Sequence, residues 1–105
     1  MTNSFFTVDV HNHILPERLP DFKKRFGYGG FVTLKSTDTG ADMMMDDGKF
    51  FRAIEHNCLN SETRIKEMDE LNIDVQVLST IPIMLSYWAE PKDCHEVCTY
   101  LNEDL

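Results

Sequence analysis

The chain has 105 residues, of which 42% are hydrophobic and 27% are charged, a composition typical of one globular domain rather than a disordered or fibrous chain. Its 18 acidic residues outnumber its 10 basic residues, and the net charge of -8 disfavours binding to nucleic acid or to anionic membrane surfaces. No stretch approaches the ~20 apolar residues of a membrane span, so we expect a cytosolic protein.

The first predicted element is a buried strand over residues 5–10, where FFTVDV is an aromatic and β-branched run. Two prolines follow in residues 11–20, and three glycines interrupt regular structure within residues 27–30. We therefore expect a loop with one helical turn after the first strand.

Residues 31–52 have the pattern of a small antiparallel unit. FVTL at residues 31–34 is strand-like, and Asp47-Gly48 is a hairpin signal before a strand in KFFRAI. The three methionines at 43–45 would supply the preceding strand. Their alternative is a helical turn that packs into a core.

A helix is predicted from a cap at Asn60 or Ser61 to about Leu71. Its apolar side comprises Ile65, Met68, and Leu71 or Asn72, and its polar side carries Glu62, Arg64, Lys66, Glu67 and Glu70. DVQVLSTIP follows as a strand that ends at Pro82, and its apolar content favours burial on both faces.

The last predicted helix begins near Pro91. Its apolar stripe consists of Cys94, Val97, Cys98, Leu101 and Leu105. The three cysteines are odd in number and lack the spacing of a zinc ribbon, so we expect a reducing compartment and a packing role for Cys94 and Cys98. His95 lies on the polar side of this helix, where a solvated side chain is expected.

Apart from the middle unit, the order is strand, helix, strand, helix, which predicts parallel pairing and an α/β fold. Two strands do not make a stable parallel sheet, and they offer little cover for the last helix. We therefore expect the start of a larger doubly layered or barrel domain, present here as a fragment or truncated product.

His11-Asn12-His13 is the candidate metal motif. Its spacing places the two histidine side chains on one side of an extended segment, and Asp9 precedes the motif where it can support their orientation. The alternative is that both histidines are hydrogen-bonded loop residues. Zinc requires three or four protein ligands, so the pair is an incomplete site. The spacing of His56 does not mark it as a further ligand.

Five sequence blocks occur in order from Val8 onward: VDVHNHILPE, DFKKRFGYGG, DGKFFR, RIKEMDELNIDVQVLSTIP and SYWAEP. With them the chain resembles the amino-terminal part of the 2-amino-3-carboxymuconate-6-semialdehyde decarboxylase family, in the amidohydrolase superfamily. The resemblance implies that residues 1–105 are part of a (β/α)8 barrel, with a small antiparallel β insertion at about residues 27–55. It also implies a zinc-dependent nonoxidative decarboxylase of tryptophan degradation, in the kynurenine pathway.

The resemblance implies roles for three residues. His11 and His13 would be zinc ligands, and Arg52 would bind a carboxylate of a small dicarboxylate substrate, a role that suits the planar guanidinium group. Local sequence alone favours a different reading of Arg52, as an exposed charge on a strand edge. The other ligands, the catalytic acid or base, and a second arginine from the partner in a homodimer are expected beyond Leu105. The short chain alone is therefore expected to be inactive.

Two other functions remain open from the sequence. The first is another metal-dependent enzyme of the amidohydrolase superfamily, because an H-x-H motif after the first strand is widely shared. The second is a noncatalytic truncated isoform that binds a partner through an exposed apolar stripe on the last helix, formed by Cys94, Val97, Cys98 and Leu101.

Overall fold

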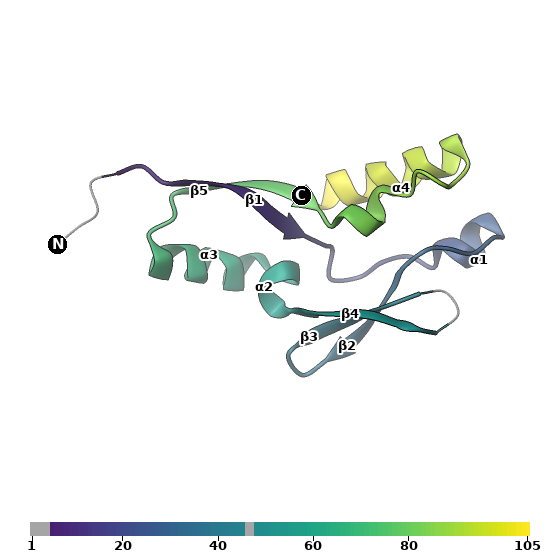
Figure 1. Cartoon of the computed structure of the whole chain (residues 1–105), viewed down its shortest axis with the longest axis horizontal. Coiled ribbons are helices and arrows are strands. Elements are labelled where there is room, and N and C mark those ends of the chain that lie inside the picture. Colours follow the sequence, from purple (N-terminus) through teal and green to yellow (C-terminus); the bar gives the residue numbers. More distant parts are fainter. Residues whose placement is uncertain (1–4, 46–47) are drawn as a thin grey trace.

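The computed structural model describes residues 5–45 and 48–105. Within these ranges the chain has a mixed α/β architecture with one parallel and one antiparallel sheet (Figure 1). The parallel sheet pairs β1 (Val8–Ile14) with β5 (Val75–Thr80). The antiparallel sheet has the order β2 (Thr33–Thr37), β3 (Gly40–Met44), β4 (Phe50–Glu55).

The helices connect the two sheets and cover part of their surfaces. They are α1 (Phe22–Phe26), α2 (His56–Leu59), α3 (Ser61–Leu71), the 3-10 helix η1 (Pro82–Leu85) and α4 (Pro91–Asp104). The single helical turn expected in the first loop is thus α1. No helix in the described ranges is long and apolar enough to cross a membrane.

The middle unit forms as predicted, and the methionines belong to a strand. Met43 and Met44 lie in β3, paired with β2 on one side and β4 on the other, so the alternative of a helical turn is wrong at these two positions. β2 begins at Thr33, later than predicted, where its pairing with Met44 of β3 starts, and the preceding Phe31 and Val32 are buried in the core. Of the predicted Asp47-Gly48 turn, Asp47 lies outside the described residues.

The predicted burial of the first strand is wrong in this chain. β1 begins at Val8, and the side chains of Phe5, Phe6 and Val10 are at least 74% exposed. The prediction that the next strand is covered on both faces is also wrong, because Val75 and Val77 of β5 are exposed. In the described part of the chain only two strands pair in this sheet, and α3 lies on one side of the pair (Figure 1).

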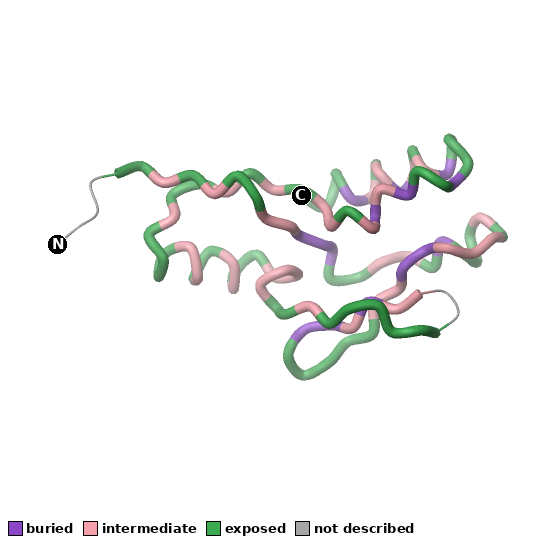
Figure 2. Tube along the Cα trace, in the orientation of Figure 1, coloured by how far each residue is buried: buried purple, intermediate pink, exposed green. Residues whose placement is uncertain are grey.

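The main core lies between α4, α1 and the segment that leads into β2 (Figure 2). Val97 and Leu101 of α4 are buried against a cluster that includes Leu15, Phe22 and Phe31. Cys94 packs against this cluster, as predicted, and Cys98 is likewise a half-buried free thiol. The proposed partner-binding stripe on this helix is therefore not exposed: its two largest aliphatic residues already pack within the chain.

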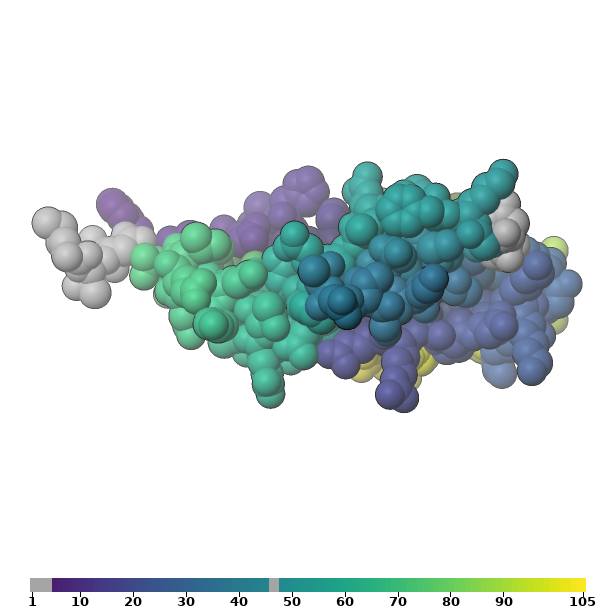
Figure 3. All heavy atoms as spheres, turned by 90° about the horizontal axis from the view of Figure 1, so that it is seen from below, coloured from purple at the N-terminus to yellow at the C-terminus, as the bar shows by residue number. Residues whose placement is uncertain are grey.

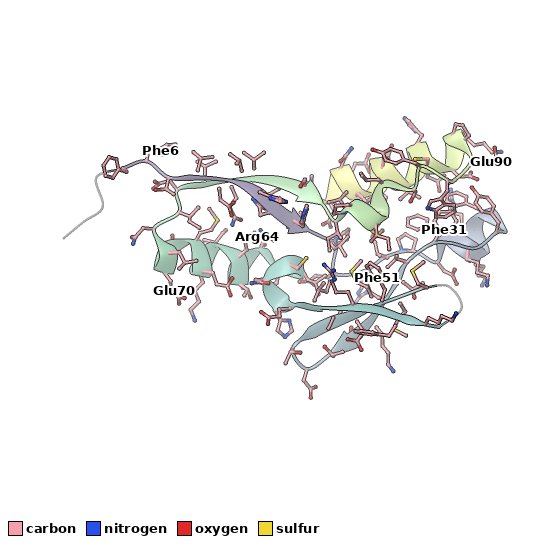
Figure 4. All side chains as sticks on the ribbon, in the orientation of Figure 1. Phe6, Phe31, Phe51, Arg64, Glu70 and Glu90 are labelled. Carbon is pink, nitrogen blue, oxygen red and sulfur yellow. The ribbon has the colours of Figure 1, made fainter. Side chains whose placement is uncertain are left out.

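The boundaries of α3 agree with the sequence, but its orientation differs from the prediction. Asn60 caps the helix by accepting a hydrogen bond from the Thr63 amide at 2.9 Å. Ile65 and Leu71, predicted to be the buried side, are exposed. Arg64, predicted to lie on the solvated side, instead points between α3 and the parallel strands, because polar side chains line the strand face that α3 covers (Figure 4).

The view from below shows how the insertion and the helices share one surface. Atoms of β2 to β4, in blue to teal, and of α2 and α3, in teal to green, occupy most of this face (Figure 3). α4, in yellow, is visible only at its margin. The carboxyl end of β1 lies where these parts meet, since α2 follows β4 directly and contacts β1.

Candidate functional site

His11 and His13 lie in the carboxyl-terminal half of β1, within the strand rather than in the following loop. Their imidazole centroids are 5.4 Å apart and the rings are nearly perpendicular. His11 is exposed and His13 is half-buried. The H-x-H spacing therefore brings both rings together, as expected for a shared site.

The ring of His13 is oriented by the neighbouring strand. Its Nδ1 lies 3.1 Å from the carbonyl oxygen of Thr80 and 3.3 Å from Oγ of Ser79. A carbonyl group only accepts hydrogen bonds, so in this contact Nδ1 carries the proton. The Nε2 lone pair is then available to a metal, the arrangement found in histidine ligands whose other nitrogen donates to a carbonyl group.

A β-bulge in β1 decides which face each side chain takes. Asp9 pairs with Gln76 and Asn12 pairs with Leu78, so three steps along β1 match two steps along β5. In a regular strand Asp9 and His13 would share a face. With one extra residue in β1, Asn12 joins Asp9 on the face toward α3, and His13 is directed to the opposite face.

Asp9 supports the bulged segment, as predicted. Its Oδ1 accepts a hydrogen bond from the His11 amide at 3.2 Å, and its Oδ2 accepts one from Nε2 of Gln76 at 3.2 Å. The Asn12 side chain donates to the carbonyl oxygens of Asp9 and Val77, at 3.3 and 3.0 Å. These bonds join the two strands on the face opposite His13.

Arg64 is the residue of this site that the sequence analysis missed. Its Nη1 donates to Oδ1 of Asn12 at 3.2 Å and to Oε1 of Gln76 at 2.9 Å, and its Nη2 donates to the carbonyl oxygen of His13 at 2.6 Å. Helical periodicity placed Arg64 among charged neighbours. The available signal was the pair Asn12 and Gln76, two amide side chains within the paired strands β1 and β5.

Cys58 lies beside the same segment. Its thiol donates to the His13 carbonyl oxygen at 3.7 Å, and its own carbonyl oxygen accepts from the Leu15 amide at 2.9 Å. Burial raises the pKa of the Cys58 thiol, so this cysteine stays protonated at neutral pH. It packs beneath the strand as a small apolar residue.

Arg52 is placed apart from this arrangement. It lies on β4 opposite Met43, is exposed, and its guanidinium carbon is 5.8 Å from the centroid of the Phe51 ring. No hydrogen bond joins Arg52 to either histidine within residues 5–45 and 48–105. The other two histidines make separate contacts. His56 contacts the Asp38 carbonyl oxygen, and His95 is exposed on α4, as was predicted for His95.

The donor set fits one part of a zinc site. Among the described residues no group of three or more histidine, cysteine, aspartate or glutamate side chains is placed to hold a metal ion. The histidine pair supplies two imidazole rings, a donor type that zinc favours. Zinc bound there would need donors beyond this pair.

This chain is similar to known proteins over most of its length. No protein-family model matches it. It is 50% identical over 98 residues to a 2-amino-3-carboxymuconate-6-semialdehyde decarboxylase of Caenorhabditis elegans and 45% identical over 98 residues to the enzyme of that name from Dictyostelium discoideum. Each match covers 93% of this chain. A protein of the same name from Sus scrofa is 50% identical over 48 residues.

The chain spans about a quarter of the length of these relatives, 24% and 27% for the first two. The resemblance found in the sequence blocks is therefore confirmed: this chain corresponds to an amino-terminal portion of proteins that carry this decarboxylase name.

Proposed function

We propose that this chain is the amino-terminal part of a zinc-dependent, nonoxidative decarboxylase that acts on 2-amino-3-carboxymuconate-6-semialdehyde in tryptophan degradation. The observation that carries the proposal is 50% identity over 93% of the chain to a protein with this name. The adjacent imidazoles of His11 and His13 support the metal requirement.

The fold that accompanies this function is a (β/α)8 barrel. β1 and β5 would be neighbouring barrel strands, and the sheet of β2 to β4 would be an insertion between them. Three features favour this arrangement: the parallel pairing, α3 on one face of the pair, and the exposed valines on the other face. In a barrel, that second face is filled by side chains of further strands.

His11 and His13 would hold the zinc ion together with ligands from the remainder of the protein. A bound zinc ion acts as a Lewis acid and lowers the pKa of water in its coordination shell. In this chain, Thr80 and Ser79 hold Nδ1 of His13, and this fixes the direction of the free Nε2 lone pair.

Arg52 would bind a carboxylate of the substrate. Its guanidinium group is exposed and free of carboxylate partners among the described residues, and a guanidinium group can hold a carboxylate through two parallel hydrogen bonds. It would also offset the repulsion between a dicarboxylate and a protein of net charge -8. A second arginine from the partner subunit of a homodimer would hold the other carboxylate.

Nonoxidative decarboxylation requires no change of oxidation state in a partner molecule. The bond to the departing carboxylate carbon breaks, its electron pair passes into the conjugated system of the substrate, and a proton takes the place of carbon dioxide. The described residues contain two metal-donor histidines and one candidate carboxylate ligand. We therefore expect no release of carbon dioxide by this chain alone.

Zinc content tests the metal assignment. In the complete decarboxylase that contains this segment, the double variant His11→Ala/His13→Ala should lose bound zinc, because two of its imidazole donors are removed. Zinc would be measured by atomic absorption after exhaustive dialysis. His95→Ala is the matched control, since His95 is exposed on α4, and it should retain zinc. Equal zinc in all three proteins would refute the assignment.

A further inference from the structure

Arg64 is a partly buried cation without a carboxylate partner. Among the described residues, its guanidinium group forms no ion pair, and its Nε atom is buried without a hydrogen-bond partner. A charged group removed from water is costly unless its surroundings compensate. All its acceptors are neutral oxygens, which suggests that Arg64 is kept for the geometry of its hydrogen bonds.

Those hydrogen bonds converge on the bulged segment that carries the histidines. One nitrogen of Arg64 joins Asn12 of β1 to Gln76 of β5, and the other holds the carbonyl oxygen of His13. Gln76 in turn donates to Asp9, whose other oxygen accepts from the His11 amide. The main-chain groups of both histidines are thus linked to one guanidinium group on α3.

We propose that Arg64 is a positioning residue that holds the bulge in β1, so that His13 faces away from α3, on the same side as His11. The inference rests on the proposed metal-binding function, but it concerns a geometry that exists without metal. If the bulge relaxed to regular alternation, His13 would move to the face of Asp9, beneath α3. Its contacts with Ser79 and Thr80 would then be lost.

The state of the His13 ring gives a direct readout. In the metal-free chain, nitrogen NMR of the imidazole groups should show His13 protonated at Nδ1, because Thr80 accepts that proton. In Arg64→Ala this preference should be lost, because His13 would no longer face Ser79 and Thr80. Overall fold would be checked by circular dichroism.

The control and the rescue separate positioning from general damage. Arg25→Ala removes the ion pair with Glu96 on α4, which among the described residues has no contact with the bulged segment, and should leave the His13 ring unchanged. A cavity of about 270 Å³ borders Arg64, Asn12, His13 and Gln76. Free guanidinium at millimolar concentration should therefore restore protonation of His13 at Nδ1 in Arg64→Ala. An unchanged ring state in folded Arg64→Ala would overturn the proposal.

Two further measurements cover the remaining outcomes. If Arg64→Ala does not fold, the guanidinium protons of wild-type Arg64 are compared with those of exposed Arg18: slow exchange at Arg64 supports the proposal, and equal exchange overturns it. In the complete enzyme, Arg64→Lys should weaken zinc binding by about 10- to 100-fold. Absence of zinc from the wild-type enzyme would refute the metal site alone, because the metal-free ring measurement is independent of it.

Discussion

Gly30 shows how closely single residues are fitted around the aromatic cluster. Its φ is 106°, and a Cβ atom built there would lie 2.7 Å from the indole of Trp88. The indole is in turn packed on Phe31, with ring centroids 4.8 Å apart. Aromatic packing therefore accounts for the position of Trp88.

Replacement of Gly30 by Ala should lower the free energy of unfolding by about 1–3 kcal/mol more than Gly27→Ala does. Both glycines have positive φ values, 106° and 85°, but a Cβ at Gly27 would meet nothing within 4 Å. The comparison therefore isolates the clash with Trp88. Urea denaturation of the two variants measures it, and equal midpoints would contradict the expected contact.

At the scale of elements, the spacing of apolar residues predicted where the helices lie more reliably than it predicted which side of each helix is buried. α4 buries Val97 and Leu101 of its predicted stripe, because an aromatic core lies against them, whereas Leu105 at its end is exposed. α3 meets the polar side chains Asn12 and Gln76, so Arg64 turns inward while Ile65 stays exposed. The spacing of apolar residues describes a helix alone and contains no information about its neighbour.

Leu101→Ala should destabilise the chain by about 2–5 kcal/mol, because it leaves a cavity beneath α4. Leu101 is 4% exposed, whereas Leu105 on the same stripe is 54% exposed. Leu105→Ala should change the free energy of unfolding by less than about 0.5 kcal/mol. Thermal unfolding followed by circular dichroism compares them, and similar transitions would show that α4 is not packed as described.

At the scale of the whole molecule, the face of β1 and β5 that points away from α3 is open. Val8 pairs with Val75 on this face, and Val77 and His13 follow toward its carboxyl end. The three valines are 40–53% exposed. Exposed valines beside a histidine pair fit a surface that further barrel strands cover in the proposed enzyme.

The proposed substrate site takes residues from both sheets, since Arg52 lies on β4 and the histidines lie on β1. In the complete enzyme, Arg52→Ala should raise KM by roughly 10- to 100-fold, through loss of a charge-assisted hydrogen bond to a substrate carboxylate. The KM of Arg52→Lys should lie between the values of the wild type and of Arg52→Ala, because lysine keeps the positive charge but lacks the planar guanidinium group. Arg18→Ala, which also removes an exposed arginine, serves as the control. Unchanged kinetics in Arg52→Ala would exclude the role.

The sequence by itself determined the order of the main elements, the Asn60 cap of α3, the antiparallel unit and the candidate metal motif. These features depend on local chemistry: Asn60 caps its own helix, and His11 and His13 are two positions apart on one strand. The sequence blocks also identified the related decarboxylases, because residue identities are preserved along the chain.

Only the tertiary structure decided which faces are buried, how β1 is bulged and where Arg64 points. Each depends on groups distant in sequence: the bulge appears only when β1 is paired with β5, 67 residues away at Asp9 and Gln76. His11-Asn12-His13 is a spacing in the sequence. It becomes a directed pair of imidazoles because Thr80 orients one ring and a guanidinium group from α3 holds the strand beneath it.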